Sequence, residues 1–209
     1  MNKHILIATA LAAFAATPSL AAQKTYALSD FTGVSAATGI SVDINVGGDY
    51  SVKAESSDDG LERLEVKVVD GELRIKRTNH NFRWRRSDKV QVTVSLPSLK
   101  SLDVSSGAAI DAKNVDAGDF SIDASSGGSI DAEGKCDDLS VDVSSGGSID
   151  ARALQCRSAN ADASSGGSAR IYASESVTGE ASSGGSVRVF GQPEKVSKET
   201  SSGGSVSVQ

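Results

Sequence analysis

The pentapeptide Ser125-Ser126-Gly127-Gly128-Ser129 decides the fold, because it returns along the chain at a nearly constant spacing. Ser-Ser-Gly begins at six positions, separated by 20, 19, 20, 18 and 19 residues: Ser105, Ser125, Ser144, Ser164, Ser182 and Ser201. The last five copies have the full Ser-Ser-Gly-Gly-Ser form, whereas the first continues as Ala108-Ala109. A flexible Gly/Ser linker would not keep such a period, so the repeat indicates a structural unit.

Apolar residues alternate with polar ones on both sides of each copy. Before the copy at Ser125 the apolar positions are Phe120, Ile122 and Ala124, and after it they continue as Ile130. A period of two residues is typical of a β-strand. The motif therefore predicts a corner between two short strands, where Gly accepts a positive φ without steric penalty.

Short strands joined by such corners predict a coil in which each turn stacks on the previous one. Parallel crossovers are almost always right-handed, so we expect an all-β fold: a right-handed parallel β-solenoid with about 19-residue turns spaced roughly 4.8 Å apart. In the last copy the inward row becomes Val196, Lys198 and Thr200, which is typical of an uncovered terminal turn. The solenoid ends are therefore expected places for association between copies.

The first 22 of the 209 residues have the parts of an export signal. They are the basic Lys3, an apolar stretch at 5–16, and small residues that predict cleavage after Ala21 or Ala22. A short membrane anchor is the alternative. Removal of one basic residue from 21 leaves 20 against 27 acids, a net charge of −7. We therefore expect an acidic exported chain, periplasmic or extracellular, with no membrane span after signal removal and no nucleic acid partner.

The two cysteines test the predicted register. Cys136 lies eleven residues after Ser125, and Cys156 lies twelve after Ser144, so both occupy nearly the same place on successive turns. One turn of rise lies near the Cα separation that a disulfide needs, and export permits oxidation. The spacing predicts a Cys136 to Cys156 disulfide; two reduced thiols or a metal pair is the alternative.

Residues 23–104 lack the clean repeat but also alternate as strands do, for example at 40–46, 64–68, 73–75 and 90–96. We expect an irregular β lead-in at 23–104 and the repeat solenoid at 105–209, in one continuous domain from 23 to 209. The lead-in carries these segments: Phe31-x-x-Val34, Gly39-Ile40-Ser41-Val42-Asp43-Ile44, Tyr50-x-Val52, Gly71-x-Leu73-x-Ile75, and Val92-x-Val94-x-Leu96-Pro97-x-Leu99-x-x-Leu102-x-Val104-Ser105-Ser106-Gly107.

With the repeat that follows, these segments resemble the bacterial family described as putative auto-transporter adhesin, head GIN domain. The resemblance implies a β-solenoid at or near the bacterial envelope with a binding or adhesive role, and it brings no catalytic residues. His80 is the only His after the signal. We therefore predict no catalytic residue, no metal site and no cofactor, and a protein that is not an enzyme.

Acidic residues form two outward rows beside the corners. The first row stands two residues before each Ser-Ser: Asp103, Asp123, Asp142, Asp162, Glu180 and Glu199. The second row is Asp111, Asp131 and Asp150, and it continues as Arg170 and Arg188. Stacked carboxylates predict a face that binds cations through oxygen ligands or meets the hydroxyls of a glycan. The alternative is a solvated face that prevents aggregation.

A basic segment lies between two strand patterns. Its predicted ligand-contact residues are Arg74, Lys76, Arg77, Phe82, Arg83, Trp84, Arg85 and Arg86. Guanidinium groups interleaved with aromatic rings suit phosphate, carboxylate or sugar rings. The alternative is an exposed loop that pairs with the protein's own acids.

These observations predict a noncatalytic exported binding or adhesion module of the bacterial cell envelope. The expected partner is an envelope or extracellular glycan, such as polysaccharide or lipopolysaccharide. Two alternatives remain: a purely structural envelope or stress-associated protein, and a polysaccharide-active enzyme on a β-helix scaffold.

Overall fold

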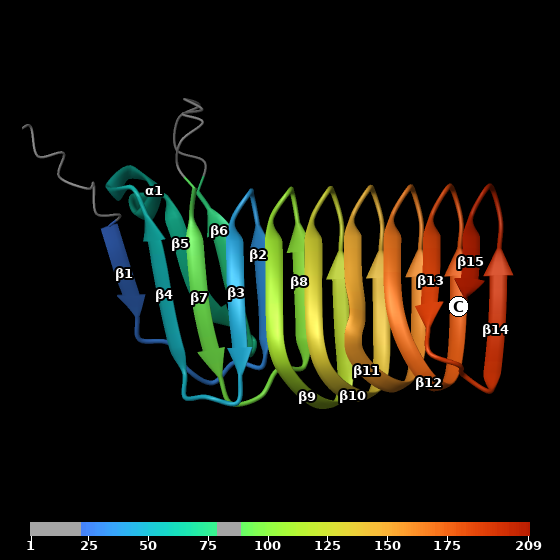
Figure 1. Cartoon of the computed structure of the whole chain (residues 1–209). Coiled ribbons are helices and arrows are strands. Elements are labelled where there is room, and N and C mark those ends of the chain that lie inside the picture. Colours follow the sequence, from blue (N-terminus) through green and yellow to red (C-terminus); the bar gives the residue numbers. More distant parts are fainter. Residues whose placement is uncertain (1–21, 79–88) are drawn as a thin grey trace, which may run out of the picture.

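The repeat turns stack into an elongated β-solenoid, seen in a computed structural model that describes residues 22–78 and 89–209 (Figure 1). Four long strands each run along one sheet, bend, and return along the opposite sheet: β9 (Ala109–Ala124), β10 (Ser129–Val143), β11 (Ser148–Ala163) and β12 (Ser168–Ala181). Neighbouring turns pair in parallel, and Asp111, Asp131 and Asp150 occupy equivalent places. The predicted solenoid is confirmed.

Three short strands follow: β13 (Ser186–Phe190), β14 (Lys195–Thr200) and β15 (Ser205–Val208). The strands β13 and β14 form one more turn on β12, and β15 pairs with β13 as the start of the next turn. The first sheet has the order β1-β4-β7-β3-β9-β10-β11-β12-β13-β15. The second sheet, formed by the returning halves of the long strands, has the order β5-β6-β2-β8-β9-β10-β11-β12-β14.

The residues before the repeat stack directly on it. In β2 (Gly33–Ala37), β3 (Ser41–Val46), β7 (Gln91–Leu96) and β8 (Ser101–Ser105), the pairing remains parallel. Antiparallel pairing joins the outer strands: β4 (Ser51–Ser56) pairs with β7 and with β1 (Ala22–Tyr26). In the second sheet, β5 (Leu64–Val69) pairs antiparallel with β6 (Glu72–Arg77), which pairs in parallel with β2. The short helix α1 (Asp58–Glu62) is N-capped by Ser57, whose side chain accepts a hydrogen bond from the backbone N–H of Gly60.

Each corner is a tight turn with two positive-φ residues. Ser126 has φ 50°, Gly127 has φ 74°, and the N–H of Gly128 donates to the carbonyl of Ser125 at 2.8 Å. This geometry is that of a type I′ turn. The corners lie along one edge of the solenoid, at the top of Figure 1.

The second Gly of each corner has a different role from the first. A Cβ on Gly147 would lie 2.6 Å from the carbonyl oxygen of Ala124 on the preceding turn, so only Gly lets the turns approach this closely. In the first corner this place is held by Ala108. Its neighbour is the connection between β2 and β3, where Gly39 N–H donates to the carbonyl of Ser106, rather than another Ser-Gly corner.

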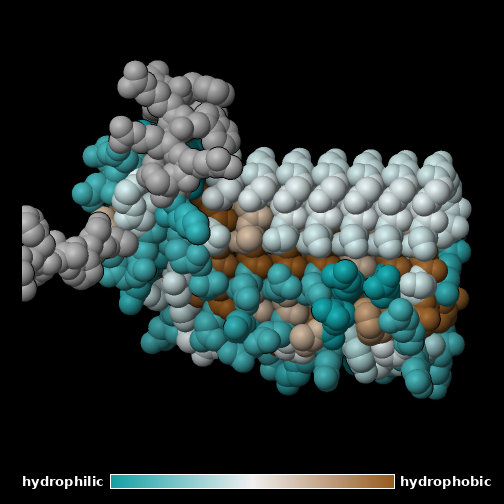
Figure 2. Space-filling view, turned by 45° about the horizontal axis from the view of Figure 1, so that its top comes forward, coloured by the Kyte–Doolittle hydropathy of each residue, from teal (hydrophilic) through white to brown (hydrophobic). Residues whose placement is uncertain are grey.

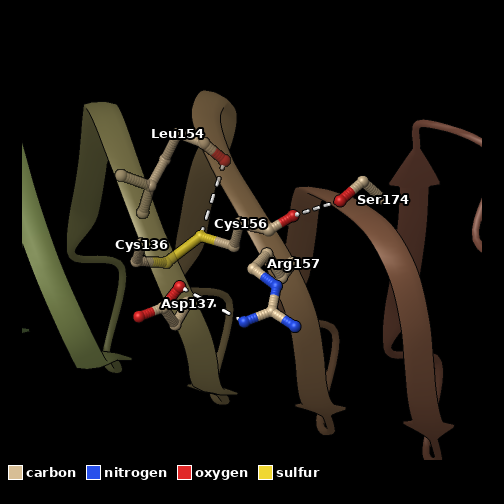
Figure 3. The surroundings of a disulfide bond; sticks show 6 residues. All are labelled: Cys136, Asp137, Leu154, Cys156, Arg157 and Ser174. Atoms are coloured by element: carbon tan, nitrogen blue, oxygen red, sulfur yellow. Dashed lines mark hydrogen bonds and ion pairs between the residues drawn. A yellow bond between two sulfur atoms is a disulfide. The ribbon is translucent and has the colours of Figure 1, made fainter.

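The core between the sheets is thin and consists of stacked rows. Buried inward rows of the first sheet include Ile110, Ile130 and Ile149, whereas the second sheet combines larger residues with the Ala residues of β11, which are Ala159, Ala161 and Ala163. Cys136 and Cys156 lie in one such row and form the predicted disulfide, with Cα atoms 4.5 Å apart (Figure 3). The disulfide is confirmed, and it joins two consecutive turns.

The two ends of the solenoid differ. At the N-terminal end, α1 and the antiparallel strands lie beyond the parallel turns (Figure 1). At the C-terminal end, β14 is exposed along its whole length, and Val196 is 44% exposed. As the sequence indicates, the last described turn has its inward row uncovered. None of the helices in the described part of the chain could cross a membrane.

Candidate functional site

One acidic row runs along the second sheet. The register places six side chains side by side on successive strands: Asp103, Asp123, Asp142, Asp162, Glu180 and Glu199. They are the six acids that precede the corners in the sequence. A shallow hollow of about 240 Å³ lies between the last three acids and the corner residues Ser164, Ser182 and Ser201. This surface offers carboxylates and hydroxyls together.

Burial makes part of this row difficult to ionise. It raises the pKa of Asp123, and the charges of Asp103 and Asp142 raise it further; the Ser121 hydroxyl, which donates to Asp123 Oδ2 at 3.3 Å, offsets this in part. Burial also raises the pKa of Asp103, against a hydrogen bond from the Ser35 hydroxyl. At neutral pH the ionised carboxylates of neighbouring strands in this row therefore repel one another.

Replacing Asp123 with Asn should stabilise the protein at pH 7 by about 0.5 kcal/mol, because the change removes a half-buried charge between two like charges. A raised pKa means that the folded state binds the proton more tightly, so the cost of the charge is present above the folded pKa and disappears as pH falls through it. The gain should vanish below about pH 4, near the ordinary Asp pKa. Urea unfolding at both pH values measures it.

The matched control is Asp49→Asn, an exposed acid outside both rows, which should change the unfolding free energy at neither pH. A loss of stability in Asp123→Asn at pH 7 would contradict stored repulsion in the row.

The second row lies on the first sheet and changes sign along its length. The register aligns Asp43, Asp111, Asp131, Asp150, Arg170 and Arg188. Asp43 was missed in the sequence because it lies outside the repeat, although Val42-Asp43-Ile44 has the same alternation as Ile110-Asp111-Ala112. The row therefore begins one strand earlier than expected.

A hollow of about 460 Å³ lies over the acidic part of this row and is lined by Asp111, Asp131, Asp150, Glu133 and Arg152 among others. Arg152 Nη2 lies 2.6 Å from Asp150 Oδ2, and this hydrogen-bonded pair lowers the pKa of Asp150. Burial raises the pKa of Asp131, and the charges of Asp150 and Asp111 add to the increase. The hollow thus contains one neutralised carboxylate and others that are open to a ligand.

The acids stand in lines and do not converge. Within residues 22–78 and 89–209, no group of three or more His, Cys, Asp or Glu side chains is arranged to hold a metal ion. Cation binding by Asp103, Asp111 or their row neighbours stays a prediction.

The described part of the basic segment lies on β6. Arg74 Nε contacts Glu72 Oε2 at 2.6 Å, and Lys76 Nζ lies 4.0 Å from Glu65 Oε2. The backbone N–H of Arg77 donates to Thr38 Oγ1 at 2.9 Å. The remaining predicted contacts lie outside the described residues: Phe82, Arg83, Trp84, Arg85 and Arg86. Acidic side chains of the protein itself therefore form ion pairs with the basic side chains Arg74 and Lys76 on β6.

The surface of the solenoid is regular along its whole length. Figure 2 shows the corners as a continuous pale strip, with brown apolar and teal hydrophilic positions in parallel lines below it. This periodic surface, together with one acidic row and one row that changes from acidic to basic, is characteristic of a repeat protein with an extended side surface rather than a single deep cleft.

Comparison with known proteins identifies the family. The family model described as "putative auto-transporter adhesin, head GIN domain" matches residues 30–193, so the chain belongs to this family. The resemblance expected from the sequence is confirmed. No curated protein matches the chain by sequence.

Solved structures share the fold at low sequence identity. A "putative adhesin" from Bacteroides fragilis has a TM-score of 0.72 and 16% identity, covering 91% of this chain and 98% of that one. A "putative lipid binding protein" from Parabacteroides distasonis has a TM-score of 0.56 and 16% identity, covering 92% and 98%. A "putative adhesin" from Parabacteroides merdae has a TM-score of 0.52 and 14% identity, covering 92% and 97%.

Proposed function

We propose that the protein is an exported, noncatalytic adhesion module of the bacterial envelope that binds glycan along the sides of its solenoid. The observation that carries this proposal is the pair of in-register polar rows, which repeat a hydrogen-bonding and charged surface from turn to turn. A polymer with repeating polar units is the kind of ligand that can use such a surface more than once. Membership of the head GIN domain family supports the adhesive role.

Export is part of the proposal. Residues 1–22 have the composition of a signal peptide, and the Cys136–Cys156 disulfide suits an oxidising compartment such as the periplasm or the cell exterior. In either place the protein meets polysaccharide and lipopolysaccharide.

The proposal is tested with the mature chain and immobilised acidic polysaccharide, neutral polysaccharide and lipopolysaccharide. We expect saturable binding to at least one of them without release of new reducing ends, both measured in the same wells. New reducing ends would show that the protein is an enzyme. Absence of binding throughout the panel would favour a structural envelope protein and contradict the proposal.

The basic segment is a proposed contact within this function. Changing Arg83, Trp84, Arg85 and Arg86 together to Ala should weaken binding to an anionic glycan, because guanidinium groups supply charge-assisted hydrogen bonds. The control is the double change Lys195→Ala and Lys198→Ala, which removes charge from the exposed strand β14. Effects in proportion to the charge removed, three positive charges against two, would indicate attraction by net charge alone.

A further inference from the structure

The row on the first sheet leaves positive charge uncompensated near its C-terminal end. Asp150 is engaged by Arg152, through Nε at 2.8 Å and Nη2 at 2.6 Å. Arg170 lies farther away, with Nη1 at 3.7 Å from Asp150 Oδ2. The exposed Arg188, on the next strand, has no acidic partner among the residues that the structure describes. Of these two guanidinium groups, Arg170 forms an ion pair only with Asp150 in the described residues, and Arg152 already engages that carboxylate at closer range.

Two aromatic rings lie at the next outward position of the same strands. Tyr172 follows Arg170 by two residues, Phe190 follows Arg188 by two, and the two aromatic residues pair in register. Both are half-buried. Eight residues after the earlier corners the chain has Lys113, Glu133 and Arg152 instead, and on β11 the strand partner of Tyr172 is Gln155. The outer surface of β12 and β13 therefore has an aromatic character that the repeat does not require.

Neighbouring groups hold each ring in place. The guanidinium carbon of Arg152 lies over the Phe190 ring, 5.6 Å from its centroid. The Tyr172 ring rests against the backbone of Gly191, where an added Cβ would come within 3.2 Å of Tyr172 Cε2 and would also meet the carbonyl of Ala173. The rings are thus positioned before any ligand arrives, which lowers the entropic cost of binding.

The spacing of these groups suits one sugar ring with a carboxylate. Two residues along a strand span about 6.6 Å, and adjacent strands lie about 4.8 Å apart. A pyranose ring over Tyr172, beside Phe190 and the Arg152 guanidinium that covers it, can therefore direct a carboxylate to the arginine pair. The C–H face of a sugar complements the negative face of an aromatic ring, and a guanidinium group donates two parallel hydrogen bonds to a carboxylate.

We propose that Arg170, Tyr172, Arg188 and Phe190 form a binding site for a uronic acid unit, the terminal or near-terminal acidic sugar of a glycan. This inference rests on the proposed function and names the ligand class of one site on the solenoid. The adjacent acids limit the ligand, because Asp131 and Asp111 continue the same row and repel a polyanion that extends along it. A short oligosaccharide is therefore the better ligand.

The test compares trigalacturonic acid with its fully methyl-esterified form and with neutral maltotriose, each titrated into the mature protein by calorimetry. We expect binding of the free acid only, since esterification removes the charge and keeps the rings. Arg188→Ala should weaken binding about tenfold, the loss expected for one charge-assisted contact. The affinity of Arg188→Lys should fall between those of the wild type and Arg188→Ala, because Lys keeps the charge but cannot donate two parallel hydrogen bonds.

Tyr172→Leu keeps an apolar side chain next to Gly191 and removes the aromatic face on which the sugar would rest, so we expect severalfold weaker binding. The matched control is Lys53→Ala. Lys53 is an exposed cation in the same outward row at the other end of the first sheet, and its removal should leave affinity unchanged. Thermal unfolding of each variant establishes that the fold is retained.

The outcomes separate this inference from the proposed function. If the protein binds polysaccharide but does not distinguish the free acid from the ester, or if Arg188→Ala and Lys53→Ala behave alike, the uronate site is wrong and the adhesion module stands. If no glycan binds, both are wrong. Tighter, Arg188-dependent binding to phosphatidylglycerol vesicles than to trigalacturonic acid would assign the cluster to lipid phosphate and overturn the uronate site.

Discussion

Gly167→Ala is expected to destabilise the protein by about 3 kcal/mol or more, the upper range for overpacking a close contact. The added Cβ would lie 2.5 Å from the carbonyl oxygen of Val143 and 3.0 Å from the backbone nitrogen of Ser144. Both atoms belong to the backbone of the preceding turn, so no side-chain rotation can relieve the clash. The turns would have to separate, and the ladder hydrogen bond from Ser168 N–H to the Gly147 carbonyl would lengthen.

The neighbouring Gly166 is the matched control. It has φ 75°, and an added Cβ would meet nothing within 4 Å. Gly166→Ala should therefore cost only the strain of a left-handed Ala, about 1 to 2 kcal/mol. Urea unfolding followed by far-UV circular dichroism measures both variants. An equal or larger loss in Gly166→Ala would contradict the assignment of close turn packing to the second Gly.

Loss of the Cys136–Cys156 disulfide is expected to cost about 3 kcal/mol, because the bond closes a loop of about 20 residues and restricts the unfolded chain. The double change Cys136→Ala and Cys156→Ala should lower the urea midpoint accordingly. Ala is a suitable replacement, since the same inward row holds Ala117 on the preceding turn and Ala173 on the following one. Both positions thus keep a side chain that this row already accommodates.

Reduction of the wild-type protein with dithiothreitol should lower the midpoint by a similar amount and should leave the double variant unchanged. A wild-type midpoint that does not move on reduction would show that the bond does not stabilise the fold. Alkylation under non-reducing conditions provides the count of free thiols in the same samples.

The repeat made the solenoid and the disulfide predictable from the sequence. Ser-Ser-Gly fixes the corners, the alternation around Ile130 fixes the inward face, and together they place Cys136 beside Cys156. Each of these inferences depends only on which residues recur at equal distances. The acidic row that includes Asp123 followed for the same reason.

Features that break the period were not predictable in this way. Asp43 joins the second row because β3 pairs with β9, and no local signal in residues 41–46 specifies a partner so far along the chain. The aromatic pair Tyr172 and Phe190 lies eight residues after Ser164 and Ser182, but no other turn has an aromatic residue at this place, so the repeat did not mark it. The bulge on β11 that makes Gln155, rather than Arg152, the partner of Tyr172 has no sequence signal either. Bulges of this kind depend on packing between turns.

The contrast between the two halves also bears on the order in which the chain can fold. In the repeat, each strand pairs with the next one, as β10 does with β11, so turns can be added one after another as a chain emerges from its N-terminus. Before the repeat, Ser41 pairs with Gln91 and Ala109, and Gly33 pairs with Ser101. These pairings form only after the later residues have been synthesised. The strands β2 and β3 are therefore synthesised early but gain their partners late. The later turns can stack on them only once β7, β8 and the start of β9 have paired with β2 and β3.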